Sequence, residues 1–217
     1  TMGLRLFRRQ CASCHAYSHE KFAIAGPASP GATSDSPGNY GAPNLASFGS
    51  VKWIRGLLSN DPVTGIRGER YFGKTLHVAG EMAEHVHETL WAAAETEADR
   101  QALATQIEQV AWALSAEAKL PYLDYAANQE KIDAGIRHLN DDTLGCIGCH
   151  NYGDNEDGYV IDLNGYASVD WLTKMISDPA QTGFYDGGSD NDRMPSFHSE
   201  ATKLLTPREI ELLVRFL

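Results

Sequence analysis

The stretches CASCH, residues 11–15, and CIGCH, residues 146–150, together contain all four cysteines of this chain. Two cysteines that are separated by two residues and followed at once by a histidine form the attachment signature of a c-type haem. The thiols bond to the haem vinyl groups, and the adjacent imidazole ligates the iron. We therefore predict two haem c groups as cofactors, with iron as the metal. The predicted attachment residues are Cys11, Cys14, Cys146 and Cys149, and the predicted imidazole ligands are His15 and His150.

Paired cysteines have two other common uses, and both fit this chain less well. A structural zinc site built from two Cys-x-x-Cys pairs would also use four thiolates, but it leaves the histidine after each pair unexplained. A disulfide framework would place its cysteines at scattered spacings in a shorter chain. Covalent haem attachment accounts for both the pairing and the histidines.

The chain also contains an internal repeat. Residues 44–62, NLASFGSVKWIRGLLSNDP, align with residues 162–179, DLNGYASVDWLTKMISDP, so that Trp53 meets Trp171 and both segments end on proline. Each segment follows a Cys-x-x-Cys-His motif and precedes a loop with one methionine. A repeat of this length indicates duplicated structural units. We predict two domains, residues 1–125 and residues 126–217.

Apolar residues recur at helical spacing in both domains, and neither domain shows the sustained alternation of a β-strand. We expect helices before Cys11, near residues 51–58, 97–116, 132–139 and 169–176, and from Thr206 onward. At the last site Thr206, Pro207 and Glu209 have the pattern of a capping box with proline in the first turn. The predicted fold class is all-α, without a sheet, with each of two tandem domains wrapped around one haem.

The ligand opposite each histidine decides the chemistry. Methionine gives an electron-transfer haem of raised potential, whereas an open position permits ligand binding or catalysis. Of the four methionines, Met2 lies at the terminus and Met175 within an apolar helix, which leaves Met82 and Met194, one in each domain. Histidine ligation would instead lower the potential, but we interpret the nearby candidates as surface residues. These are His77, His85, His87 and His198.

Three further residues are predicted to support the haems. The carbonyl of Pro43 is placed to accept the Nδ1 proton of His15 and so to fix its ring. Ile161 stands where proline would be in the second domain, so any such bond there is expected from another carbonyl. Trp53 and Trp171 either donate their indole N–H groups to haem propionates or are core aromatic residues.

Charge is distributed unevenly along the chain, whose net charge is −11. Residues 1–125 contain 11 basic and 13 acidic side chains, and residues 126–217 contain 7 and 16. This acidity argues against a nucleic-acid or anionic-membrane partner and favours a basic redox partner. No apolar run approaches the roughly 20 residues that span a bilayer. We expect a chain that is soluble as it stands, with membrane attachment only through an anchor or a fused membrane domain.

The residues named above resemble a class I cytochrome c. In the first domain the resemblance rests on Gly3, Leu6, Phe7, the motif at 11–15, Pro43, Leu45 and Met82, and in the second on Gly135, Leu139, the motif at 146–150, Leu163 and Met194. The strings FGSVKWIRGLL, YFG and EMAE resemble the two-haem tail fused behind cytochrome b in some bacterial, planctomycete-type quinol:cytochrome c oxidoreductases.

That resemblance implies an electron relay on the periplasmic side of the membrane. An iron–sulfur protein or a cytochrome b complex would supply electrons, and a soluble cytochrome or a terminal oxidase would accept them. The chain alone is expected to be an electron carrier, without quinol chemistry of its own. Two alternatives remain open: a two-haem peroxidase-like enzyme with an open haem site, and a haem-based gas sensor, which would need an output domain.

Overall fold

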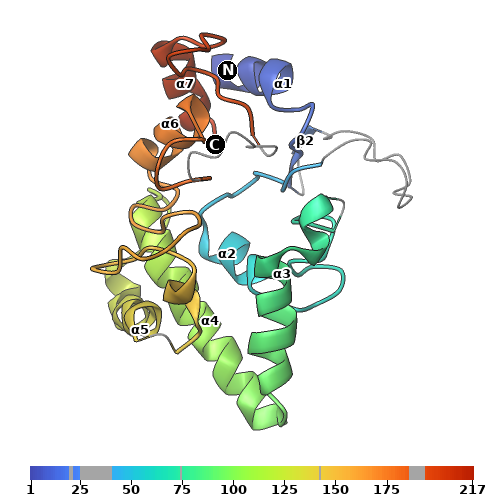
Figure 1. The fold of residues 1–217 in the computed structure, drawn as a ribbon, viewed down its shortest axis with the longest axis vertical. Helices are drawn as coiled ribbons and strands as arrows, with labels where there is room; N and C mark the ends of the chain where they lie inside the picture. The colour runs from blue at the N-terminus through green and yellow to red at the C-terminus, as the bar shows by residue number, and fades with distance from the viewer. Residues whose placement is uncertain (20–21, 25–40, 74, 142, 186–193) are drawn as a thin grey trace. The chain divides into compact units, whose positions relative to one another are not determined.

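The protein is mostly helical, with one short two-stranded sheet in the part of the chain that is described (Figure 1). The structure is a computed structural model and describes residues 1–217 except 20–21, 25–40, 74, 142 and 186–193. The α-helices are α1 (Met2–Gln10), α2 (Val51–Leu57), α3 (Glu81–Glu84), α4 (Glu97–Ala118), α5 (Gln129–Asn140), α6 (Val169–Ser177) and α7 (Pro207–Val214). The 3-10 helices are η1 (Leu76–Ala79), η3 (Ala126–Asn128) and η4 (Cys146–Gly148), and η2 (His85–Trp91) is a π-helix.

The helices expected from apolar periodicity are confirmed at α1, α2, α4, α5, α6 and α7. The expectation that the chain has no sheet is wrong. Strands β1 (Tyr17–His19) and β2 (Phe22–Ile24) pair in antiparallel register, with Tyr17 opposite Ile24. Three residues are too few to show alternation in the sequence. The Tyr17 ring packs edge-on against Phe7 of α1, with 5.6 Å between ring centroids, and this packing favours the hairpin.

The chain forms two compact units, which divide inside α4. Unit 1 comprises residues 1–48, 52–107 and 217, and unit 2 comprises residues 49–51 and 108–216. This division is based on packing. The boundary between residues 125 and 126 is based on the sequence repeat, and that boundary stays a prediction. Among the described residues, no helix has both the length and the apolar character needed to cross a bilayer.

The centre of unit 1 is an aromatic cluster around Trp53 of α2. The centroid of the Trp53 ring lies 4.7 Å from that of Phe48 and 5.2 Å from that of Tyr71, and both contacts are edge-on. The Tyr71 hydroxyl donates a hydrogen bond of 2.8 Å to the Trp53 carbonyl, and burial raises the pKa of Tyr71. Gly56 permits this approach, because a Cβ atom there would lie 2.1 Å from the Tyr71 hydroxyl oxygen. The cluster therefore depends on the absence of a side chain at position 56.

Unit 2 contains a close helix crossing between α5 and the second half of α4 (Figure 1). Gly135 lies at the crossing, where an added Cβ would be 2.0 Å from the Gln109 carbonyl oxygen. Polar pairs flank it: Lys131 Nζ lies 2.9 Å from Glu108 Oε1, and His138 Nε2 lies 2.9 Å from Gln109 Oε1. A glycine at this position lets the two backbones approach more closely than any larger residue would.

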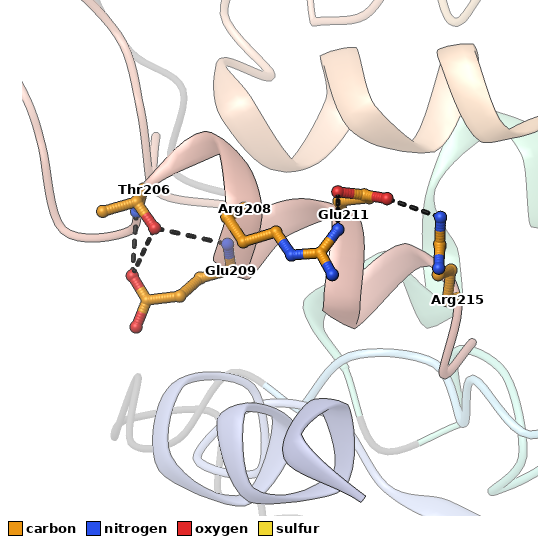
Figure 2. A network of polar contacts seen from close by, with 5 residues as sticks. All are labelled: Thr206, Arg208, Glu209, Glu211 and Arg215. Atoms are coloured by element: carbon orange, nitrogen blue, oxygen red, sulfur yellow. Dashed lines mark hydrogen bonds and ion pairs between the residues drawn. The ribbon is translucent and has the colours of Figure 1, made fainter.

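Helix α7 begins with the predicted capping box, which Figure 2 shows. Thr206 Oγ1 accepts from the Glu209 N–H at 3.3 Å, and Glu209 Oε2 accepts from the Thr206 N–H at 2.9 Å. Glu211 is paired with both Arg208 and Arg215, and its pKa is lowered, chiefly by the Arg208 hydrogen bond. Since these ion pairs are exposed, the cap stabilises the helix more than they do.

Candidate functional site

The first Cys-x-x-Cys-His motif is a tight turn that continues from α1. The Cys11 N–H donates to Phe7 O at 2.8 Å, so the helix hydrogen bonds extend into the motif. The N–H groups of Cys14 and His15 then both donate to Cys11 O, at 3.0 and 2.8 Å. The turn therefore places two thiols and one imidazole within five residues of the helix end.

The second motif repeats this geometry in unit 2. The Cys149 and His150 N–H groups donate to Cys146 O at 3.2 and 2.9 Å, within and just after η4. No disulfide joins the four cysteines, all of which lie in the described part of the chain and are partly exposed. Burial, with a smaller contribution from Cys14, raises the pKa of Cys11 to about 11. The Cys11 thiol is therefore protonated at neutral pH.

Each motif histidine is held by its Nδ1 atom. His15 Nδ1 lies 2.9 Å from Pro43 O, which is the hydrogen bond predicted from the sequence. His150 Nδ1 lies 2.6 Å from Ile161 O. The expectation of a different carbonyl in the second domain is wrong, because a main-chain carbonyl accepts the bond whichever side chain that residue has. In both rings the carbonyl fixes Nδ1 as the protonated nitrogen, so the lone pair of the neutral ring lies on Nε2.

Electrostatics favour the neutral form of the first imidazole. Burial lowers the pKa of His15, and the hydrogen bond to Pro43 only partly opposes that effect. A neutral imidazole is the form that ligates a metal ion. His15 is thus poised to ligate without first losing a proton at neutral pH.

The same backbone frame surrounds both motifs. Leu45 N–H donates to Ala16 O at 3.0 Å, and its counterpart Leu163 donates to Asn151 O at 3.0 Å. Ala42 N–H donates to Cys14 O at 2.9 Å, and Val160 N–H donates to Cys149 O at 3.2 Å. The first unit thus has the same hydrogen bonds as the second, although a much longer connection separates its motif from Ala42. Most of that connection lies outside the described residues. This pattern is that of an insertion into a duplicated scaffold.

The repeat extends to the backbone angles of the loop before each tryptophan helix. Ser47 and its counterpart Gly165 have φ values of 63° and 66°. Gly49 and its counterpart Ala167 have φ values of 74° and 58°. Left-handed backbone costs roughly 1–2 kcal/mol for a residue other than glycine. The two copies therefore keep one unusual conformation at matching positions, although glycine occupies each position in only one copy.

Both tryptophans use their indole N–H within this frame. Trp53 Nε1 donates to Asn44 O at 2.9 Å, and Trp171 Nε1 donates to Asp162 O at 3.0 Å. Both side chains are buried, and Trp171 packs edge-on against Phe184. The interpretation of Trp53 and Trp171 as core residues accounts for these contacts, because an indole has one N–H and each is bonded to the main chain.

The candidate methionines lie in separate units. Met82 lies in unit 1 with His15, and Met194 lies in unit 2 with His150; both side chains are partly exposed. The expected loop around Met82 is wrong, since the residue lies in the short helix α3 after Gly80. Met194 lies outside regular structure, as predicted. Met175 is buried in α6, which agrees with its predicted core role.

His87 is partly exposed, but one of its ring nitrogens is buried. His87 lies in η2, and its Nε2 atom is buried without a hydrogen-bond partner. Burial and, to a smaller extent, Arg67 lower the pKa of His87. The sequence contains no sign of this, because the burial of one ring atom depends on how the helix packs.

A separate polar cavity of about 350 Å³ lies in unit 2 beside Trp171. Its lining includes Glu117, Lys119, Asp162 and Lys174, and none of the predicted iron ligands. Glu117 accepts from the Gly165 N–H at 3.1 Å and from the Tyr152 hydroxyl at 3.4 Å. Burial of Tyr152, together with the nearby charge of Glu117, raises the pKa of Tyr152 to about 12.

No family model, curated protein or solved structure matches the chain.

Proposed function

We propose that the chain is a di-haem c-type cytochrome that relays electrons between two covalently attached haems. The observation that carries this proposal is the duplicated frame: two Cys-x-x-Cys-His turns, each with the histidine Nδ1 bonded to the carbonyl of the residue before the repeated loop. Chance similarity in the sequence would not reproduce the same hydrogen bonds and the same left-handed residues in both units. The frame would hold an imidazole and two thiols against one cofactor.

The residues present fit a haem c group. Cys11 and Cys14 would form thioethers at one site, and Cys146 and Cys149 at the other. His15 presents Nε2, since Pro43 holds Nδ1 and increases the basicity of the ring. When bound, the haem iron supplies one-electron transfer. The protein's part is to fix the ligands so that little rearrangement accompanies the change of charge.

Met82 and Met194 are the proposed sixth ligands, one for each haem. The relay would form the cytochrome c part of a bacterial quinol:cytochrome c oxidoreductase on the outer face of the membrane. An iron–sulfur protein or cytochrome b complex would be the donor, and a basic soluble cytochrome or a terminal oxidase the acceptor. The sequence resemblance and the acidic second half support these assignments.

Two haem additions are expected when the chain is produced in a host that matures c-type cytochromes. The thioether bonds survive acid extraction and denaturing electrophoresis, so intact mass spectrometry counts the groups directly. Cys11→Ser/Cys14→Ser is expected to retain one haem, on unit 2, and Cys146→Ser/Cys149→Ser is expected to retain one, on unit 1. An unmodified wild-type chain from a host that matures a control cytochrome would refute the proposal.

Electron transfer to a basic cytochrome is expected to slow steeply as salt rises. Opposite charges accelerate encounter by about 10- to 1,000-fold at low ionic strength, and screening acts over about 10 Å at 0.1 M. From the sequence we predict that the partner docks near the acidic stretch at 186–192, which lies outside the described residues. Asp154, Glu156 and Asp157 are exposed in the loop after the second motif and provide a described test site.

Stopped-flow rates at several salt concentrations would measure this effect. Glu156→Lys/Asp157→Lys is expected to reduce the rate at low salt more than the matched change Glu84→Lys/Glu95→Lys in unit 1. All four side chains are exposed, so neither variant creates a buried charge. A salt-independent wild-type rate would show that the acidic surface does not steer the partner.

A further inference from the structure

The segment after Met82 changes from α-helix to π-helix. The His85 N–H donates to both Glu81 O and Met82 O, and η2 then continues to Trp91, whose indole donates to Leu58 O at 2.9 Å. A π-helix is rare, occurs mostly as a single turn within an α-helix, and is frequent at functional sites. An observed insertion directly beside a proposed iron ligand therefore calls for a functional explanation.

The π-helix begins three residues after Met82. Met82 lies in α3 and η2 starts at His85, so His87 is the third residue of the π-helical segment. A π-helix bonds each N–H to the carbonyl five residues earlier rather than four. His87 therefore does not have the orientation that a continued α-helix would give it. Ala83 and Val86 lie between Met82 and His87 in the sequence and are fully buried, so this segment packs closely against the rest of unit 1.

His87 is partly exposed, but one of its ring nitrogens is buried and unsatisfied. Its Nε2 is buried and has no hydrogen-bond partner, although buried polar atoms are nearly always paired. Leaving such an atom unpaired removes it from water without a compensating hydrogen bond, which is unfavourable. The neighbouring Arg67 does not bond to it: Arg67 Nε donates to Val78 O at 3.3 Å, and its Nη1 pairs with Glu88 at 3.5 Å. A ligand to Nε2 would remove this cost.

We propose that His87 is a second axial ligand of the first haem, which exchanges with Met82. This inference rests on the proposed function. In the exchange the bond from Met82 Sδ to the iron would break, and the lone pair of His87 Nε2 would form a bond in its place. A neutral imidazole ligates through its lone pair, so this exchange would transfer neither a proton nor an electron.

Exchange would set the potential of the first haem. Thioether ligation raises the potential relative to a second imidazole, so the first haem would have a lower potential with His87 bound than with Met82 bound. In unit 2 no π-helix follows Met194 within the described residues: His198, four residues after Met194, forms an isolated bridge with Lys203.

The test uses the full chain with both haems attached. We compare Met82→Ala, Met82→Ala/His87→Ala and the matched control Met82→Ala/His85→Ala, which removes a histidine two positions earlier on the same helix. Electron paramagnetic resonance of the oxidised protein reports the spin state of each haem. Carbon monoxide difference spectra of the reduced protein report open sites.

Met82→Ala is expected to lose the methionine–iron band of the first haem yet remain low-spin, closed to carbon monoxide and lower in potential. Met82→Ala/His87→Ala is expected to become high-spin at one haem and to bind one carbon monoxide, whereas the His85 control stays closed. A high-spin, carbon monoxide-binding haem in Met82→Ala itself would overturn the inference.

A haem count by mass spectrometry accompanies every variant. Two haems together with an open Met82→Ala site would refute only the role of His87 and would leave the proposed function intact. Fewer than two haems in the wild-type chain would refute the proposed function itself. His87→Ala alone is expected to keep the methionine–iron band and to show the circular dichroism of the wild type, which separates ligation from misfolding.

Discussion

Met194→Ala is expected to open the second haem to carbon monoxide and to lower its potential by more than ~0.1 V, within the ~0.8 V range that axial ligands span. The thioether stabilises reduced iron, and alanine offers no atom to replace it. A redox titration with carbon monoxide difference spectra measures both effects.

The segment that carries Met194 is anchored independently of the methionine. Phe197 is buried and its N–H donates to Ser177 O at 3.0 Å, while Ser196 Oγ donates to Asp178 Oδ1 at 2.6 Å. Removing the Met194 side chain should therefore remove an iron ligand without unfolding the segment. Any loss of the spectral band then reports ligation.

Met175→Leu is the matched control for this prediction. Met175 is buried in α6, and leucine conserves its volume, so the change should cost less than about 1.5 kcal/mol and leave both haems unaltered. If Met194→Ala left the second haem closed, His198 would be the next candidate, since Leu205 O holds its Nδ1 and leaves Nε2 for a ligand. If Met175→Leu opened that haem instead, the assignment of Met194 would be wrong.

Gly135→Ala is expected to destabilise the protein by about 2–3 kcal/mol, as overpacking typically does. The added Cβ would lie 2.0 Å from Gln109 O and 2.9 Å from the Cβ of Ala113. Alanine favours a helix over glycine by about 1 kcal/mol, but backbone atoms of α4 cannot move aside as a flexible side chain would. The steric term therefore outweighs the gain in helix propensity. Denaturant unfolding of the haem-loaded chain measures the change.

Gly148→Ala is the control for the crossing. Nothing lies within 4 Å of a Cβ at position 148, and the first motif has Ser13 at the matching place. We expect no more than a few tenths of a kcal/mol from this substitution. Equal destabilisation by the two variants would show that α5 does not cross α4 closely in solution.

Features that depend on a few consecutive residues could be predicted from the sequence. The capping box of α7 needs only Thr206, Pro207 and Glu209, and the structure has it in full. The bond from His15 to Pro43 was also predicted, although 28 residues separate the two, from the place of the proline just before Asn44 and Leu45. Local pattern also predicted the long helix α4, which begins at Glu97 as expected and ends at Ala118, two residues beyond the predicted end.

Features that depend on distant contacts could not be predicted in this way. The β1–β2 hairpin has strands of three residues, too short for periodicity to indicate them, and its Tyr17 packs against Phe7 of α1. Ile161 was discounted because its side chain differs from proline, although the bond uses only its carbonyl. Propensity is a weak guide wherever tertiary packing determines the conformation.

The sequence by itself determined the two Cys-x-x-Cys-His motifs, the duplicated unit and most of the helices, because these follow from residue identity and short-range spacing. Only the tertiary structure decided that Trp53 and Trp171 bond to main-chain carbonyls, that Met82 precedes a π-helix and that the Nε2 atom of His87 is buried without a partner. The physical reason is that solvation and hydrogen-bond partners depend on which surfaces meet, and residues far apart in the chain supply those surfaces.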